Sequence, residues 1–320
     1  MSNRILGHSM GGVPVAWGIN TIALAGGRIF YVDPVAGADG NSGRDPDAAF
    51  LTIQAAHDAT TTAKNDIIVL VAAASVNALA ATLAWDHTYT HMVGACAPAG
   101  IGQRARVSGS AALDITPLVT ITGRGCFFGN IQFVNDKDAD TASGCVNMTN
   151  GSGNCYFQNC TFKLSNATLL ARTDTYSLRL YDASEITFDN CTFGTSDVEA
   201  DGAGYDVIIE GGAKRTQFKN CRFLTRAHSS TSRVFVKFDN TAVGGTECTI
   251  FDNCLFMNLS MNHAVTMTDA LSVGGGSSHN VIIKGDSQIV GVTGWADTTT
   301  FVYVPNYTTT AAGCSQTPAA

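Results

Sequence analysis

One stretch near the amino end has the spacing of a catalytic motif. Gly7-His8-Ser9-Met10-Gly11 matches the Gly-x-Ser-x-Gly pattern, in which a strained turn between a strand and a helix exposes a nucleophilic serine. Gly12-Val13-Pro14 follows the motif and does not begin a helix, and no later stretch alternates strands with helices. The sequence therefore predicts no hydrolase chemistry at Ser9.

Acidic residues are the second group that could do chemistry, because glycoside hydrolysis uses paired carboxylates and calcium binds clustered ones. The densest acidic run is Asp136-Lys137-Asp138-Ala139-Asp140, which we expect to be a solvated loop. Asp182 with Glu185, and Asp206 with Glu210, could meet carboxylates from neighbouring parts of the fold. Any acidic chain offers such pairs by chance, so they do not predict a site.

Basic residues and histidines give no stronger signal. Arg179, Arg215 and Arg222 have no acidic cluster beside them in the sequence. Besides His8 of the motif above, six histidines are scattered along the chain, and single histidines are usually structural: His57, His87, His91, His228, His263 and His279. We therefore predict no catalytic residue, no cofactor-binding residue and no metal ligand, and we expect a protein that is not an enzyme.

The elements that would have to position any site are set by a six-residue phrase that occurs five times. The phrase has the form Phe-x-Asn-x-x-Phe, and its starts are 29, 31, 30 and 33 residues apart. The copies run from Phe128 to Phe133, Phe157 to Phe162, Phe188 to Phe193, Phe218 to Phe223 and Phe251 to Phe256. Self-similarity at such a period indicates a repeat architecture.

The residues of the phrase and those that flank it indicate which repeat architecture the chain adopts. Short alternating runs such as Cys155-Tyr156-Phe157 flank it, and alternation of this kind is the strand signal. Two strands that meet at an asparagine suggest a bend, because asparagine tolerates the left-handed backbone conformation. About 30 residues then make one coil of an all-β solenoid, a parallel β-helix. A β-sandwich with chance similarity is the alternative, and five copies in phase disfavour it.

In a parallel β-helix, equivalent residues of successive coils stack at the strand spacing of roughly 4.8 Å. We therefore predict a column of phenylalanines inside the coil, a column of asparagines at the bend and a column of cysteines beside it. These structural-ladder residues are Phe128, Asn130, Phe157, Asn159, Cys160, Phe188, Asn190, Cys191, Phe218, Asn220, Cys221, Phe251, Asn253 and Cys254. The position between Phe and Asn holds Gly129, Gln158, Asp189, Lys219 and Asp252, a mixture that is typical of a surface.

The pattern of the ten cysteines does not predict a disulfide-stabilised scaffold. Cys160, Cys191, Cys221 and Cys254 occupy one repeat position, so their Cβ atoms would point the same way, whereas a disulfide needs them to converge. We predict free thiols that fill space in the interior. This usage favours a chain that folds in a reducing cytosol.

Composition excludes some classes of partner. The formal charge of −7 disfavours nucleic acid, and no apolar run is long enough to span a membrane. The amino end carries no apolar stretch of signal-peptide length, so we expect no secretion by that route. Only 14% of the residues are charged, which suits a solenoid with a dry interior.

The segment before the repeats carries a family resemblance. Tyr31-Val32-Asp33-Pro34, the turn residues Gly37, Asp39, Asn41, Gly43 and Pro46, and then Ala49 to Ala56 resemble the N-terminal cap of the pectin-lyase-like right-handed β-helix superfamily. The likeness extends over roughly residues 28–290 and is greatest for β-helix structural proteins of tailed bacteriophages. It implies a right-handed parallel β-helix whose open end is plugged by a capping helix, here Thr52 to Ala59. The superfamily holds lyases, hydrolases and structural proteins, so the likeness bears on fold more than on function.

The expected organisation has four parts. Residues 1–29 form an N-terminal arm, and 30–65 hold the cap strand, turn loop and helix. Residues 66–296 form the parallel β-helix, beginning with the strand Asp66 to Val71, and 297–320 hold a C-terminal strand and tail. The arm is apolar but broken by glycine, so we expect it to bind another molecule through Leu6, Val15 and Trp17.

The resemblance implies a structural virion protein of a tailed bacteriophage, assembled in the host cytoplasm. We expect a capsid decoration or cement protein, a homotrimer whose partners are the major capsid protein or other virion subunits, with no cofactor, nucleic acid or membrane. The alternative is a phage tail spike or depolymerase acting on host polysaccharide. A secreted polysaccharide lyase is the third possibility.

Overall fold

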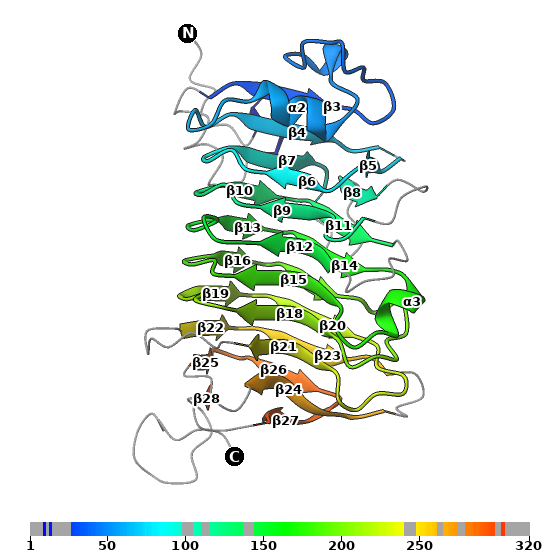
Figure 1. Ribbon diagram of the computed structural model, residues 1–320, viewed down its shortest axis with the longest axis vertical. Helices are drawn as coiled ribbons and strands as arrows, with labels where there is room; N and C mark the ends of the chain where they lie inside the picture. The colour runs from blue at the N-terminus through cyan, green and yellow to red at the C-terminus, as the bar shows by residue number, and fades with distance from the viewer. Residues whose placement is uncertain are drawn as a thin grey trace.

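The computed structural model describes residues 27–73, 75–97, 105–109, 115–136, 144–239, 248–260, 265–273, 279–297 and 302–304, and the backbone of 9–10 and 13–14. In these residues the chain winds as a parallel β-helix of three long sheets, which confirms the predicted fold class. Figure 1 shows the strands stacked as rungs along the long axis, with the amino-terminal cap at one end.

The three sheets take one strand each from every coil. Sheet 1 holds β3 (Ile29–Val32), β4 (Ile67–Val71), β7 (His91–Ala95), β10 (Phe127–Gly129), β13 (Tyr156–Gln158), β16 (Thr187–Asp189), β19 (Thr216–Lys219), β22 (Cys248–Asp252), β25 (Asn280–Lys284) and β28 (Val302–Tyr303). Sheet 2 holds β5 (Asn77–Leu79), β8 (Arg106–Gly109), β11 (Gln132–Asn135), β14 (Thr161–Leu164), β17 (Thr192–Gly194), β20 (Arg222–Thr225), β23 (Leu255–Asn258) and β26 (Gln288–Val290).

Sheet 3 completes each coil. It holds β6 (Leu83–Trp85), β9 (Val119–Ile121), β12 (Gly144–Met148), β15 (Tyr176–Tyr181), β18 (Tyr205–Glu210), β21 (Val234–Asp239), β24 (Met267–Val273) and β27 (Val292–Ala296). Outside the three sheets, β1 (Ser9–Met10) pairs with β2 (Val13–Pro14) in antiparallel fashion. The short helices are η2 (Pro46–Ala48), α2 (Ile53–Ala59) and α3 (Ala167–Leu170).

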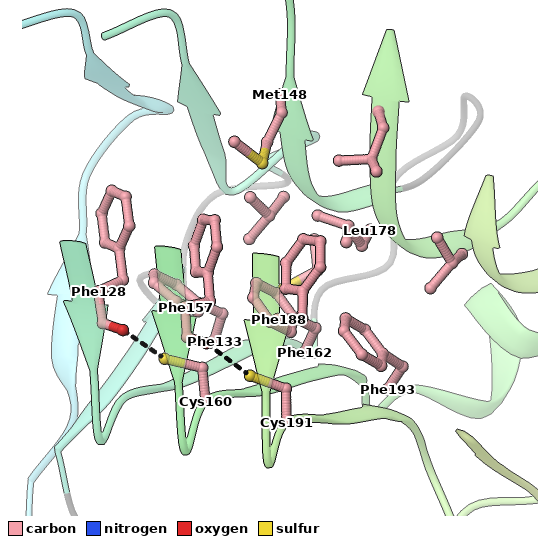
Figure 2. Packing of buried hydrophobic residues seen from close by; sticks show 14 of the residues in the cluster. Phe128, Phe133, Met148, Phe157, Cys160, Phe162, Leu178, Phe188, Cys191 and Phe193 are labelled. Atoms are coloured by element: carbon pink, nitrogen blue, oxygen red, sulfur yellow. Dashed lines mark hydrogen bonds between the residues drawn. The ribbon is translucent and has the colours of Figure 1, made fainter. Parts of the chain in front are cut away.

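The phenylalanines of the repeat form two interior columns, as Figure 2 shows for the central coils. The first runs from Phe128 to Phe251, with consecutive ring centroids 4.7, 4.9, 5.0 and 5.0 Å apart. The second runs from Phe133 to Phe256 in sheet 2 and meets the first edge-on. Stacking within a column and T-shaped contacts between columns are both favourable ring geometries, which confirms the predicted ladder.

The asparagines of the repeat make the bend between sheets 1 and 2. Their φ angles are positive, between 52° and 58° in Asn130, Asn159, Asn190, Asn220 and Asn253. The side-chain amides run along the axis, for example from Asn190 Nδ2 to Asn159 Oδ1 at 2.7 Å. Because asparagine tolerates this conformation and its amide pairs with the next coil, one residue type fills the whole column.

The cap is fastened to the first coils by α2 and Arg28. Thr52 Oγ1 accepts the N–H of Ala55 as the N-cap of α2, so the helix begins one residue after the predicted Thr52. Arg28 pairs with the buried carboxylate of Asp66 at 2.6 Å and holds the pKa of that carboxyl below its usual value.

At the other end of the solenoid, β28 pairs with β25, so sheet 1 continues past residue 296. The four-part division stays a prediction, and most of residues 1–29 and 305–320 lie outside the described residues.

Candidate functional site

The outer face of sheet 3 gathers aromatic and charged side chains. Tyr176, Tyr205, Ile208 and Val234 form an apolar cluster on strands β15, β18 and β21, separate from the interior core. The centre of each strand presents one outward residue, in register as Asn147, Arg179, Ile208, Lys237 and Ser272. The strand alternation that buries Leu178 and Leu180 therefore places Arg179 outside.

The charged residues of this face are paired. Arg179 contacts Glu210 on the next coil and lies over the ring of Tyr181, 5.4 Å from its centroid. Lys237 Nζ donates to the Tyr205 hydroxyl at 3.2 Å and lies 3.2 Å from Asp239. The Tyr205 hydroxyl in turn donates to Asp174 in the connecting loop before β15, at 3.3 Å. These contacts fix the polar groups in place around the ring cluster.

A second cluster lies on the loops that lead from sheet 2 into sheet 3. Ala200 and Ala227 form an isolated parallel bridge, and both are fully buried. The residues on either side of each alanine therefore point outward and face one another across the two loops. Glu199 Oε1 accepts from Arg226 Nη2 at 3.3 Å, and Asp201 Oδ1 lies 2.8 Å from His228 Nδ1.

The second cluster has the form of an oriented base. His228 and Asp201 have side chains 53% and 47% exposed, so a solute reaches both. A neutral His228 donates its Nδ1–H to Asp201, which leaves the lone pair on Nε2, 3.9 Å from Glu199 Oε2. A carboxylate that fixes the tautomer of an exposed imidazole is an arrangement used in general acid–base catalysis.

The carboxylates that the sequence singled out are separated by the fold. Asp206 points into the interior, where Arg233 Nη2 lies 3.3 Å from its Oδ1, so it does not meet Glu210. Burial raises the pKa of Asp206 to about 7. Asp182 accepts from the Gly212 N–H in a turn, and Glu185 pairs with Arg215 at 2.7 Å. Arg179 and Arg215 thus have acidic partners after all, because the coil register brings in residues about thirty positions away.

The other candidates lie at surface positions with ordinary contacts or fall outside the described residues. Asp136 accepts from Ser108 at 3.1 Å, while Asp138 and Asp140 lie outside the described residues. Only the backbone of Ser9 is described, and Leu6, Val15 and Trp17 are not, so their predicted roles stay predictions. Asp189 and Asp252 are partly exposed on sheet 1, as expected for a surface position.

A shallow groove follows the asparagine bend. It has a volume of about 400 Å³. The residues that line it include Asn190, Asn220, Asn253, Asp286 and Gln288. The asparagine amides along it are engaged with other coils, as in the bond from Asn253 Nδ2 to Asn220 Oδ1 at 2.9 Å. Arg222, Asp286 and Gln288 are exposed along the groove, so it also offers polar groups to a ligand.

The loop cluster escaped sequence reasoning although a signal was present. The tripeptides Glu199-Ala200-Asp201 and Arg226-Ala227-His228 have the same charged-Ala-charged pattern 27 residues apart. The spacing departs from the 30 residues that join Phe193 to Phe223 because the loops differ in length. A search for a repeat of fixed period therefore misses the register of the loops.

Comparisons with known proteins bear on the fold. No family model and no curated protein matches the chain. Pectin methylesterase PemA from Erwinia chrysanthemi superposes with a TM-score of 0.57 at 13% identity, covering 90% of this chain and 92% of that one. A rhamnogalacturonan lyase superposes with a TM-score of 0.50 at 11% identity, covering 80% of this chain and 73% of that one. ORF18 of Geobacillus virus E2 superposes with a TM-score of 0.47 at 12% identity, covering 91% of this chain and 64% of that one. This likeness is too low to bear on function.

These comparisons confirm the pectin-lyase-like β-helix fold and correct one expectation. The sequence predicted a protein that is not an enzyme, yet solved structures that share the fold, the pectin methylesterases and the lyase, are enzymes. The expectation rested on the absence of a local motif, and in a solenoid a site is built from residues one coil apart. At 11–13% identity, the likeness shows the fold alone. Among the described residues no helix is long and apolar enough to cross a membrane.

Proposed function

We propose that this protein binds and cleaves a polysaccharide, as a tail spike or depolymerase of a tailed bacteriophage does with host polysaccharide. One observation carries the proposal: the loops that lead into β18 and β21 hold Asp201 and His228 2.8 Å apart, and these two strands carry part of the aromatic face of sheet 3. The site thus combines an oriented base with a surface suited to sugar rings.

The loop cluster supplies the chemistry in this proposal. His228 Nε2 takes a proton from a water molecule or from the sugar, and Asp201 stabilises the imidazolium that forms. Glu199, whose Oε2 lies 3.9 Å from His228 Nε2, is the second carboxylate within reach of the same substrate. The bridge between Ala200 and Ala227 holds both loops in register, which keeps the acid and the base at a fixed separation.

The face of sheet 3 supplies the binding surface. Tyr181 is 43% exposed, and a flat ring of this kind packs against the apolar side of a sugar. Arg179 with Glu210, and Lys237 with Asp239, offer donors and acceptors for hydroxyl groups on either side of the rings. Because the pairs neutralise each other, the face suits a polymer whose recognition depends on hydroxyl groups.

The experiment is a product assay on a panel of host capsule and lipopolysaccharide preparations. We expect release of reducing ends, of unsaturated sugars or of ester-linked groups, which distinguishes a hydrolase, a lyase and an esterase. His228→Gln and Asp201→Asn should each lower the rate about a hundredfold or more, the typical contribution of a positioned acid or base.

A matched control separates this site from the groove over the asparagine bend. Asp286 is exposed and lines that groove, so Asp286→Asn should leave the rate unchanged. Loss of activity in Asp286→Asn with full activity in His228→Gln would move the site to the groove. No product from any polysaccharide would end the proposal.

A capsid decoration protein is the second candidate, and the cap end favours it. Val35 is 64% exposed and Leu51 40% exposed, and both belong to the cap. Exposed apolar side chains on the cap suit an attachment surface for a major capsid protein. Deleting residues 2–24 and mixing the product with undecorated particles tests it: binding should be lost while the solenoid stays folded, and undiminished binding would contradict it.

A further inference from the structure

Three side chains that could bind a metal meet where the cap helix touches the first coil. His57 comes from α2, while Asp86 and His87 follow β6. One ligand atom from each lies within 4.8 Å of the others. His57 Nε2 is 3.7 Å from Asp86 Oδ1, and His87 Nε2 is 4.0 Å from the same oxygen.

His57 is buried without a partner for its ring nitrogen. Its side chain is 4% exposed, and Nε2 has no hydrogen-bond partner. The ring lies between Trp85 and His87, with centroids 4.8 and 4.4 Å away, so it cannot swing out to water. A buried polar atom without a partner is unfavourable, and it calls for a ligand that the protein chain does not supply.

Thr60 determines which nitrogen of His87 carries the proton. The Thr60 hydroxyl donates to the His57 carbonyl at 2.7 Å, and its oxygen lies 2.7 Å from His87 Nδ1. Since its one proton is committed to the carbonyl, the hydroxyl accepts from His87 Nδ1–H. The lone pair of neutral His87 is therefore on Nε2, the nitrogen nearer Asp86. A hydrogen bond that fixes the tautomer from behind is typical of metal-binding histidines.

We propose that His57, His87 and Asp86 bind a divalent transition-metal ion of the zinc type, which fastens the capping helix α2 to the first coil. Two imidazole nitrogens and one carboxylate oxygen form a ligand set that such ions prefer over calcium or magnesium. A water molecule completes a tetrahedral site on the exposed side.

The ligand atoms need only small movements to close on an ion. Ligands at about 2.0–2.2 Å from a tetrahedral zinc ion lie about 3.3–3.6 Å from one another. The separations of 3.7 and 4.0 Å exceed this by less than 1 Å. Asp86 has a side chain 62% exposed on a turn, so it has the freedom to close the site.

Metal binding would link the capping helix to the first coil. Helix α2 has seven residues, of which Ile53, Ala56 and His57 are buried. An ion held by both α2 and the turn after β6 would keep the end of the solenoid covered, which protects the edges of its sheets.

The test is zinc binding by the full chain after treatment with a chelator. We expect about one ion per chain by elemental analysis, a rise in melting temperature on adding zinc, and a cobalt spectrum without sulfur-to-cobalt charge transfer. Asp86→Asn and His87→Asn, which change exposed or partly exposed side chains, should weaken binding at least tenfold and abolish the rise in melting temperature.

Two controls exclude other ligands. His228→Asn removes the other histidine–aspartate contact, and Cys248→Ser removes the one partly exposed thiol among the described cysteines. Both should bind zinc as the wild type does. Undiminished binding by Asp86→Asn and His87→Asn, no binding by the wild type, or a thiolate spectrum with cobalt would each overturn the proposal.

Discussion

The ring of Phe188 lies parallel to that of Phe218, with centroids 5.0 Å apart and planes 9° from parallel, although thirty residues separate them in the sequence. Both side chains are fully buried. Each ring also meets Phe193 edge-on, at 5.3 and 5.4 Å. The core is therefore a stack in which each phenylalanine contacts the coil before it, the coil after it and the neighbouring sheet.

Truncation of Phe188 to alanine should destabilise the protein by about 3–5 kcal/mol, the cost of removing a large buried side chain and leaving a cavity. The neighbouring rings are held by their own stacks and cannot collapse into the space. Urea unfolding followed by circular dichroism measures the change. Leu259→Ala is the control, since Leu259 is 40% exposed, and it should cost less than about 0.5 kcal/mol. Equal effects of the two changes would contradict the stacked core.

The asparagine bend gives a second prediction, on backbone conformation. Asn190 has φ of 52° and donates from Nδ2 to Asn159. Asn190→Ala and Asn190→Gly both lose the amide contact, but only alanine places a Cβ in the left-handed region, at a cost of about 1–2 kcal/mol. We therefore expect the glycine variant to unfold at higher urea than the alanine variant, the reverse of the usual order within a strand. Equal midpoints would mean that the bend relaxes.

The regular coils were predictable because the same residues return in the same positions. The phrase from Phe157 to Phe162 and its later copies predict the phenylalanine column, the asparagine bend and the cysteine position directly. The structure shows each of these three features. The positions of the repeat residues could be predicted without any argument from their side-chain chemistry. The period was enough, since one coil can stack on the next in register only with equivalent residues aligned.

The candidate site was not predictable in the same way, because loops of unequal length shift its register. His228 meets Asp201 across 27 residues, while the strands that follow, β18 and β21, pair across 29, as Val207 does with Val236. His57 and His87 meet only because α2 folds back over the first coil. Each contact joins a loop or a cap to a coil, and the sequence period does not encode those distances.

The cysteine column gives a third prediction, on reactivity. Cys160, Cys191, Cys221 and Cys254 are free and buried, and the Cys191 Sγ–H donates to the carbonyl of Phe157 at 3.5 Å. Burial raises the pKa of the Cys191 thiol, so the reactive thiolate is scarce at neutral pH. Because burial keeps the reagent away from all four thiols, we expect slow alkylation of the four in the native protein and complete alkylation in denaturant without reductant, measured by mass spectrometry.

Cys248 provides an internal reference for that experiment, because it is only partly buried. Among the cysteines that the structure describes, it should be alkylated first in the native protein. A pair of column cysteines that stays unlabelled in denaturant and becomes labelled after reduction would show a disulfide, which the parallel Cβ directions of the column disfavour.

The last prediction concerns His91 and the dependence of stability on pH. His91 is 3% exposed, and its Nδ1 accepts the N–H of Phe127 at 3.0 Å. Burial lowers the pKa of His91 to about 4, from 6.5 for the unperturbed group. The unfolded chain therefore binds a proton that the folded chain does not between about pH 6.5 and pH 4. Stability is fully present above that range and is lost as pH falls through it, by up to about 1.4 kcal/mol per pH unit.

His91→Gln removes this titration and leaves the rest of the chain in place. At pH 7.5 the variant should be less stable than the wild type, because the contact with the Phe127 N–H is weakened. The difference in the free energy of unfolding should narrow as pH falls from 6.5 to 4.5, since only the wild type loses the contribution of a neutral His91. Urea unfolding at four pH values measures it. The lowered pKa of His57 adds a slope of the same sign to both proteins and cancels in the difference. A difference that stays constant across the range would show that folding does not lower the pKa of His91.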